Sequence, residues 1–452
     1  MSTTPLVNEG TLHWYDGLTR KHWKTLNGSF LGWIFDGYEA MAIIVVLVPM
    51  LRSLLMPEQA HEISVYAGIV VGVTLLGWAF GGVIGGVLAD YVGRKRMMMW
   101  SIFLYAVFSG LTALSTGFVM LCMMRFLTGL ALGSEWSTGV ALVSETWPEN
   151  ARTKGLGFLQ SGFGWGSLIA SLVWFVLSSA DPLGGETWRL VFAVGALPAF
   201  VVLYIRRGID ESEKWQRAVR DKLWNATRED TGKLPSETDS SGKRPFTLKQ
   251  LFTERVALRY ILIFIVLGIV TNVGFWAIAT WLPGTTAKLA KAEGFADPTQ
   301  WAAIEAILYT IGAIIAYVLA GFIIDVIGRR LFVSLSFVGG LVITFVTYRM
   351  ITTAMGMEIA APINGFFTLG CAYVWITIYP GEVFTSTVRT SALSAIFSGS
   401  RFVAWFFPII AGSLITFFGG TANLAVTVGS VFVLGIILPW FLPETKGKGI
   451  PE

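Results

Sequence analysis

Charged residues lie inside several long apolar stretches of the sequence, where an ionised side chain has little water around it. Asp36 and Glu39 are three residues apart and therefore share one face of a helix, while Arg125 and Glu135 lie in another stretch. Ionisable groups at such depth are costly unless paired, hydrated or protonated, and they are functional candidates by default. We expect these four residues to couple protons, with Asp36 or Glu39 as the proton carrier and Arg125 as its alternating partner. The alternative is a static ion pair that fixes helix packing.

Arg401 lies in a later apolar stretch that contains no acid of its own. A guanidinium can hold a carboxylate through two parallel hydrogen bonds, so we expect Arg401 to anchor an anionic substrate. The alternative is a permanent salt bridge to Glu135 or to another acid. Further side chains near the middle of the apolar stretches are expected to line a substrate cavity, although ordinary packing is the alternative for each aromatic one: Tyr38, Trp136, Gln160, Asn272, Trp276, Tyr373 and Trp375.

The elements that must position these residues are membrane-spanning helices. The 452 residues are 54% hydrophobic and only 14% charged, with a mean hydropathy of +0.65, whereas about 25% charge is usual in soluble domains. Apolar stretches of about 20 residues can span a bilayer as helices. The sequence contains twelve such stretches: 28–51, 64–89, 97–118, 121–143, 155–178, 188–206, 257–282, 301–324, 331–349, 359–379, 391–417 and 422–442.

The distribution of positive charge predicts the orientation of these helices. With both termini inside, 25 of the 33 lysines and arginines lie in cytoplasmic segments and 5 lie at the other side, as the positive-inside rule requires. Residues 207–255 are rich in charge, which indicates a cytoplasmic linker. We therefore expect an N-terminal six-helix bundle in residues 1–206 and a C-terminal bundle in residues 256–452. The expected location is the inner (cytoplasmic) membrane of a cell.

The two halves repeat each other. A Gly-x-x-x-Asp-x-x-Gly-Arg pattern that contains Asp90 recurs at Asp325, 235 residues later, and a Glu-x₆-Arg pair that begins at Glu145 recurs at Glu382, 237 residues later. Such duplication is a known transporter architecture. Because the repeated charges lie at the cytoplasmic ends of helices, we expect them to form a gate, with orientation alone as the alternative: Asp90, Arg94, Glu145, Arg152, Asp325, Arg329, Glu382 and Arg389.

With these motifs the chain resembles the major facilitator superfamily over essentially its whole length. Glu135-Trp136 and Glu145 with the residues around them are similar to the sialate and lactate proton-symporter branch. The Asp36-Gly-Tyr-Glu39 run is similar to the aromatic-acid proton symporters. This resemblance implies an all-α membrane fold of twelve helices in two pseudo-symmetric six-helix bundles. It also implies that Arg125 faces the acid of the first helix.

The expected function is uptake of a small organic anion with protons by alternating access. Sialic acid, lactate and aromatic acids remain open as substrates, and the partners are protons and the lipid bilayer. An exporter, a uniporter or a non-transporting receptor of the same fold is the alternative. We expect no enzyme, cofactor or metal site, since the three histidines lie outside the apolar stretches. We also expect no ATP as a partner, because the phosphate-binding Gly-Lys-Ser/Thr loop is absent. Nucleic acid is not expected either, because the net charge of +4 reflects the positive-inside bias of a membrane protein.

Overall fold

The chain is helical throughout the part that the structure describes. The computed structural model describes every residue except 1–12, 225, 228–243, 280, 406–413 and 452. The helices of the first half are α1 (Arg20–Leu54), η1 (Pro57–Glu62), α2 (Ile63–Val92), α3 (Arg94–Thr112), α4 (Phe118–Leu132), α5 (Glu135–Thr146), α6 (Glu149–Ala180), η2 (Gly184–Glu186), α7 (Trp188–Val194) and α8 (Ala199–Gly208). The linker contributes α9 (Glu213–Arg220) and α10 (Thr247–Thr253).

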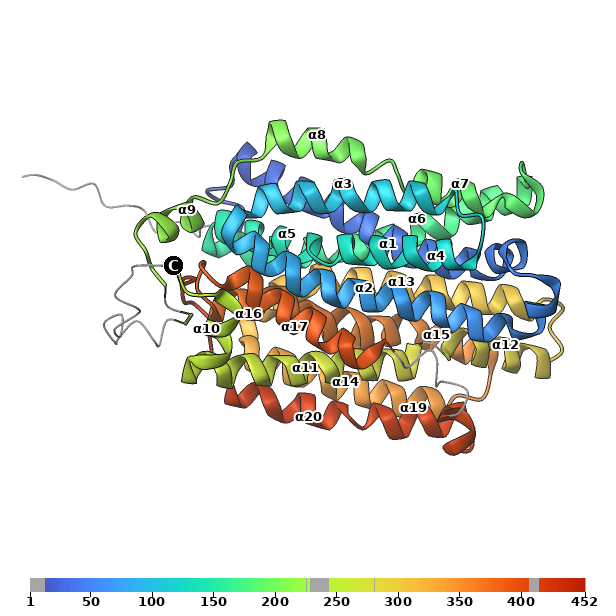
Figure 1. Ribbon diagram of the computed structural model, residues 1–452. Coiled ribbons are helices and arrows are strands. Elements are labelled where there is room, and N and C mark those ends of the chain that lie inside the picture. Colours follow the sequence, from blue (N-terminus) through green and yellow to red (C-terminus); the bar gives the residue numbers. More distant parts are fainter. Residues whose placement is uncertain (1–12, 225, 228–243, 280, 406–413, 452) are drawn as a thin grey trace, which may run out of the picture.

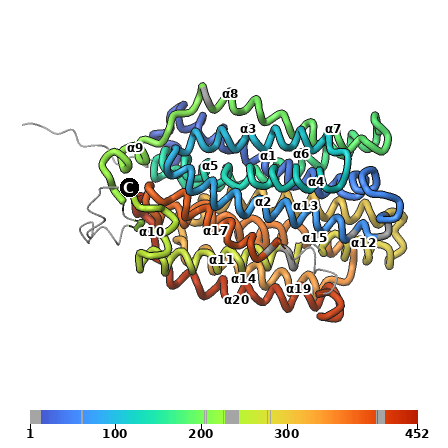
Figure 2. The backbone as a smooth tube through the Cα atoms, viewed as in Figure 1, coloured from blue at the N-terminus to red at the C-terminus, as the bar shows by residue number. Residues whose placement is uncertain are grey.

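The second half has the same kind of construction. Its helices are α11 (Arg255–Ala279), α12 (Leu282–Ala292), α13 (Pro298–Ile327), α14 (Arg329–Arg349), α15 (Ala354–Asn364), η4 (Gly365–Cys371), α16 (Ala372–Val383), α17 (Arg389–Ala404), α19 (Thr421–Gly429), α20 (Phe432–Ile437) and η5 (Leu438–Phe441). In Figure 1 the long helices of both halves run roughly parallel, and the tube in Figure 2 follows the same course. The expected all-α membrane fold is confirmed.

Ten segments of the described chain are long and apolar enough to cross a membrane. They coincide with ten of the twelve expected stretches, and α3 and α17 occupy the other two. The surface around the bundle is apolar as well, since Phe175, Val119 and Val326 are each about 70% exposed on long helices. Exposed apolar side chains in this number are expected of a face that meets lipid rather than water.

Several of the expected helices are interrupted, and two of these breaks lie in the first half. The stretch 188–206 divides into α7 and α8 around Gly195 and Pro198, where proline cannot supply the backbone donor that a continuous helix needs. The stretch 121–143 divides into α4 and α5 at Gly133 and Ser134. Glu135 is therefore the first residue of a new helical segment, and it lies in the interior with no exposed surface.

The linker helices α9 and α10 and the C-terminus lie at one end of the molecule, on the left of Figure 1, which we call the linker end. Helices α12 and α19 reach the opposite end. The halves pack against each other along two pairs of helices, α2 with α17 and α6 with α13. The division into bundles at residues 206 and 256 stays a prediction.

Glycines allow very close approach along the α6–α13 pair. A Cβ atom placed on Gly157 of α6 would lie 2.5 Å from the carbonyl oxygen of Tyr317, and one on Gly321 of α13 would lie 2.5 Å from the carbonyl oxygen of Thr153. Any side chain larger than hydrogen would therefore force the two backbones apart.

Candidate functional site

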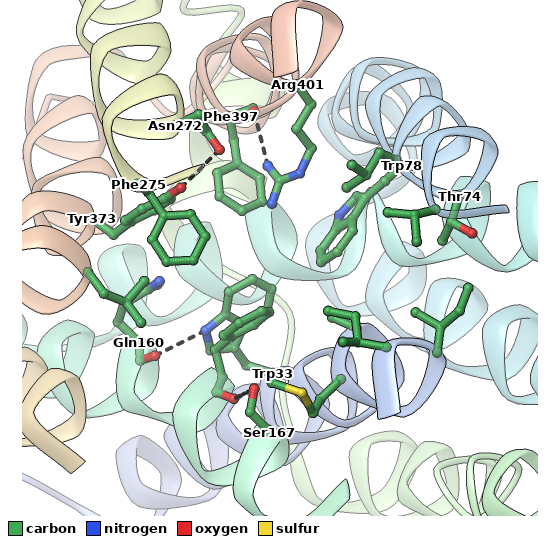
Figure 3. Close-up of a pocket in the computed structure, with 18 of the residues that line it drawn as sticks. Trp33, Thr74, Trp78, Gln160, Ser167, Asn272, Phe275, Tyr373, Phe397 and Arg401 are labelled. Atoms are coloured by element: carbon green, nitrogen blue, oxygen red, sulfur yellow. Dashed lines mark hydrogen bonds between the residues drawn. The ribbon is translucent and has the colours of Figure 1, made fainter. Parts of the chain in front are cut away.

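A cavity of about 180 Å³ lies between the two halves. Its wall is mostly apolar and is built by α1, α2, α6, α11, α13, α16, α17 and the π-helical segment η4. Figure 3 shows Arg401, Phe397 and Trp78 on one side of this cavity and Trp33 and Gln160 on the other. Four of the residues expected from the sequence line it, namely Gln160, Asn272, Tyr373 and Arg401.

Arg401 is the cationic residue of the cavity wall and is only 8% exposed. One of its guanidinium nitrogens donates to the carbonyl oxygen of Phe397 at 3.0 Å. The guanidinium carbon lies 4.4 Å from the ring centre of Trp78 and 3.5 Å from that of Phe397. No carboxylate forms an ion pair with Arg401 within the described residues, so the alternative of a salt bridge to Glu135 does not hold in this structure.

Gln160 of α6 holds several polar groups together beside the cavity. Its side-chain oxygen accepts hydrogen bonds from the indole of Trp136 at 3.0 Å and from the hydroxyl of Thr377 at 2.7 Å. Its backbone oxygen accepts from the indole of Trp33 at 3.2 Å. Because Thr377 belongs to α16 of the second half, this glutamine joins the two halves as well as lining the cavity.

Asn272 and Tyr373 form the polar part of the second half's wall. The hydroxyl of Tyr373 donates to the side-chain oxygen of Asn272 at 2.9 Å, and the amide of Asn272 donates to the hydroxyl of Ser400 at 2.8 Å. Figure 3 shows this pair across the cavity from Trp33. These bonds fix the orientation of the Asn272 amide.

The acid of the first helix that meets Arg125 is Glu39. The two side chains form an ion pair of 3.1 Å and are each about 1% exposed. Glu39 also accepts a hydrogen bond from Ser109. The remaining donors of Arg125 bind Thr112 and Thr128, at 2.8 and 2.9 Å for the terminal nitrogen. Glu39 and Arg125 are thus a buried pair with well-satisfied hydrogen bonds.

Asp36 lies one turn away on α1 and faces Glu135 instead. Both side chains are completely buried, and none of their four carboxyl oxygens accepts a hydrogen bond from a described donor. A Cβ atom on Gly32 would lie 2.0 Å from an oxygen of Glu135, so the glutamate lies directly against α1. The structure therefore separates the four expected coupling residues into two pairs of different character.

The charges expected to form a gate gather at the linker end in two equivalent clusters. In the first half, Arg94 contacts Asp90 and Glu145 at 3.2 Å each. In the second half, Arg329 contacts Asp325 at 3.2 Å and Glu382 at 2.6 Å. The two clusters use the same positions of the repeat.

Several contacts cross between the halves here. Arg389 binds Glu145 at 2.7 Å, and Arg152 lies within electrostatic reach of Glu382. Lys154 pairs with Asp325, and Arg244 of the linker donates to the backbone oxygens of Asp90 at 2.8 Å and of Thr387 at 2.9 Å. The structure thus has a closed linker end.

A carboxylate caps the helix that follows each cluster. Glu211 accepts hydrogen bonds from the backbone nitrogens of Arg94 and Lys95, and Glu444 accepts from those of Arg329 and Arg330. Burial alone would raise the pKa of Glu444, but these and neighbouring backbone N–H groups hold the pKa below its usual value. The repeat therefore extends to the first turn of α3 and α14, where a negative charge is favourable.

The other expected cavity residues lie elsewhere. Tyr38 donates its hydroxyl to the backbone oxygen of Val191 at 2.8 Å, and Trp375 packs against Phe264 and donates to Thr271. Trp136 stacks on Phe397 behind the wall at a ring distance of 4.0 Å. The side chain of Trp276 lies outside the described residues.

Sequence reasoning missed most residues of the wall and its support, among them Trp33, Trp78, Phe397 and Thr377. The tryptophans of membrane proteins usually lie at the two membrane–water interfaces. A tryptophan in the middle of an apolar helix could therefore have indicated a residue of the cavity wall.

Comparison with known proteins agrees with this architecture. The sugar (and other) transporter family matches residues 22–452. The sialic acid transporter NanX of Escherichia coli is 34% identical over 202 residues, which are 45% of this chain and 47% of that protein, so the match spans about half of either chain. The cis,cis-muconate transport protein of Acinetobacter baylyi is 24% identical and covers 92% of this chain and 94% of its own.

The proton:xylose symporter XylE has the same fold. A ligand-bound structure of it superposes with a TM-score of 0.75 at 19% identity, covering 95% of this chain and 98% of that chain. The protein is a multi-pass membrane transporter and not an enzyme. The chain belongs to the sugar (and other) transporter family of the major facilitator superfamily.

Proposed function

We propose that this transporter takes up a small organic anion together with protons by alternating access. The observation that carries the proposal is Arg401, a buried cation in the cavity wall without a carboxylate partner among the described residues. A guanidinium in this setting needs an anion or water, and a substrate carboxylate supplies two acceptor oxygens in matching geometry. Relatives named for sialic acid and for muconate, both carboxylic acids, support an anionic substrate.

The form of the cavity favours a small aromatic carboxylate. Trp33, Trp78 and Phe397 present flat apolar surfaces, and about 180 Å³ is less than the 300–1,000 Å³ that is usual for drug-sized ligands. Sialic acid carries many hydroxyl groups that this wall would leave unsatisfied. An aromatic acid such as benzoate would place its ring between these side chains and its carboxylate on Arg401.

Proton coupling in this proposal uses Glu39 and Arg125 together with Asp36 and Glu135. Burial makes an isolated charge costly, so each carboxylate is stable only with a cation or a proton. The closed linker end corresponds to the cytoplasmic side, with both termini inside the bacterial inner membrane, and its two charge clusters form the gate. The predicted bundles 1–206 and 256–452 move relative to each other, and residues 207–255 connect them. No ATP takes part.

Uptake of benzoate, lactate and sialic acid into proteoliposomes, with and without an imposed pH gradient, tests this function. We expect benzoate to accumulate only when the gradient is directed inward. Equal entry without a gradient would indicate a uniporter, and accumulation under the opposite gradient an exporter. Binding without transport would indicate a receptor.

A further inference from the structure

Among the described residues, Glu305 of α13 is a buried acid without an ion pair and interacts electrostatically with Glu358. Asp36 and Glu135 are two further buried acids of the spanning helices that form no ion pair. Neither carboxyl group accepts a hydrogen bond from a described donor, although both are completely buried. Each is instead the other's neighbour, across the contact between α1 and α5. The acids that do have a basic partner are Glu39, Asp90, Glu145 and Glu382.

Three other charged or titratable groups interact with this pair. Glu39 lies on the same helix and is neutralised by Arg125. Tyr105 of α3 is fully buried, and its hydroxyl has no hydrogen-bond partner and interacts electrostatically with both acids. Arg401 of α17 lies within electrostatic reach of Asp36. The pair therefore has a cation nearby but no direct ion pair.

Two neighbouring carboxylates in a buried site cannot both remain ionised, because like charges repel and burial disfavours the charged form of each. One proton between them turns the repulsion into an O–H···O⁻ hydrogen bond. The pair then carries a single negative charge, which balances the positive charge of Arg401. The empty site is neutral in this state.

A substrate carboxylate on Arg401 would change this balance. The anion cancels the positive charge of Arg401, and the site is left with one net negative charge away from water. A net buried charge is costly, and one proton from solution restores neutrality by protonating the second carboxyl group. By reciprocity, a proton on the pair favours binding of the anion to the same degree.

We propose that Asp36 and Glu135 share one proton in the empty transporter and take up a second proton when a substrate carboxylate pairs with Arg401. This inference rests on the proposed function, because it assigns the coupling of proton and anion to a specific pair of acids. It gives Arg401 two roles, binding of the anion and electrostatic control of the pair. One proton enters through this pair for each monoanion.

Infrared spectroscopy of the purified protein tests the charge balance without any substrate. Protonated carboxyl groups give a separate C=O stretching band, so we expect the Arg401→Gln variant to gain one such group relative to the wild type at neutral pH. The matched variant Arg401→Lys keeps the positive charge and should show no gain. The gain should also be absent when Asp36→Asn and Glu135→Gln are added to Arg401→Gln. No gain in Arg401→Gln would overturn the proposal.

A second measurement uses benzoate, a monoanion at neutral pH. Calorimetric titration in buffers of different ionisation enthalpy should reveal uptake of one proton per benzoate bound by the wild type and by the control variant Glu186→Gln, whose acid lies in an exposed pair with Arg189. The Asp36→Asn/Glu135→Gln variant should take up none. Uptake that persists in this double variant would overturn the proposal. If benzoate does not bind, the proposed substrate class fails, while the infrared comparison still decides whether the pair responds to Arg401.

Discussion

Ser391 of α17 donates two hydrogen bonds to one carboxylate oxygen of Asp90 on α2, from its backbone nitrogen at 2.9 Å and from its hydroxyl at 2.6 Å. The two residues are 301 positions apart and belong to different halves. The same aspartate pairs with Arg94. The most specific motif of the repeat is therefore bound directly to the other half of the molecule.

We expect Asp90→Asn to shift the protein towards a state that is open at the linker end. The change removes a charge that strengthens two hydrogen bonds across the halves, and hydrogen bonds to charged groups contribute about 1.5–3 kcal/mol each. Because alternating states have similar energies, a loss of this size changes their populations markedly. Spin-label distances across the linker end measure the shift. Asp210→Asn, which changes an exposed pair between the linker and Lys21 of α1, serves as control. Identical distance distributions would show that the motif does not act as a gate.

Glu39→Gln should abolish gradient-driven accumulation and spare exchange of internal for external substrate. The neutral amide cannot exchange a proton, yet it can still accept hydrogen bonds from Arg125 and Ser109, so the fold should persist. Counterflow and accumulation assays in proteoliposomes separate the two activities. Glu186→Gln, which changes an exposed pair with Arg189, should leave both unchanged. Normal accumulation by Glu39→Gln would leave Asp36 and Glu135 as the coupling residues.

Arg401→Lys should weaken binding of benzoate at least about tenfold, which corresponds to about 1.4 kcal/mol. Lysine keeps the charge but lacks the planar fork that can donate two parallel hydrogen bonds and stack on Trp78. Equilibrium binding to purified protein measures the change, and Arg349→Lys at the exposed end of α14 is the control. Unchanged affinity in Arg401→Lys would exclude bidentate binding.

Glu444→Gln should lower thermal stability at neutral pH, and its effect should disappear in acid. The pKa of Glu444 is lowered in the folded protein, so its ionised form stabilises the fold above the ordinary glutamate value of about 4.3 and loses this effect as the pH falls through the folded value. Melting temperatures of wild type and variant should therefore converge on acidification. Glu58→Gln, at an exposed position, should show no such difference at any pH. A constant difference at all pH values would mean that the amide loses packing rather than charge.

The sequence was sufficient to predict the spans and the repeat, because both depend on local composition and spacing. It was also sufficient to mark Asp36, Glu39, Arg125 and Glu135 as buried charges. It could not assign partners among them, since Asp36 and Glu39 lie on one face of α1 and differ by only about 4.5 Å along its axis. Their partners depend on how α1 meets α4 and α5, which is a non-local property. The position of Glu135 depends further on the break at Gly133 and Ser134.

The cavity wall was harder to predict for a similar reason. Trp33 and Trp78 come from α1 and α2, two successive long helices of the first half, and Phe397 comes from α17 of the second half. Periodicity shows that such side chains are apolar but not which helix each of them faces. Gln160 and Arg401 were predictable because a polar side chain inside an apolar span is energetically costly. Its presence therefore indicates a functional or structural role.

The glycine contact between α6 and α13 has a mechanical consequence. At Gly157 and Gly321 the nearest atoms of the opposite half are backbone atoms. Such a contact can serve as a fulcrum, about which the halves tilt while the separation of the two backbones stays nearly constant. When a few hydrogen bonds at one end of the molecule break, this tilt would open that end and bring the two halves together at the other end.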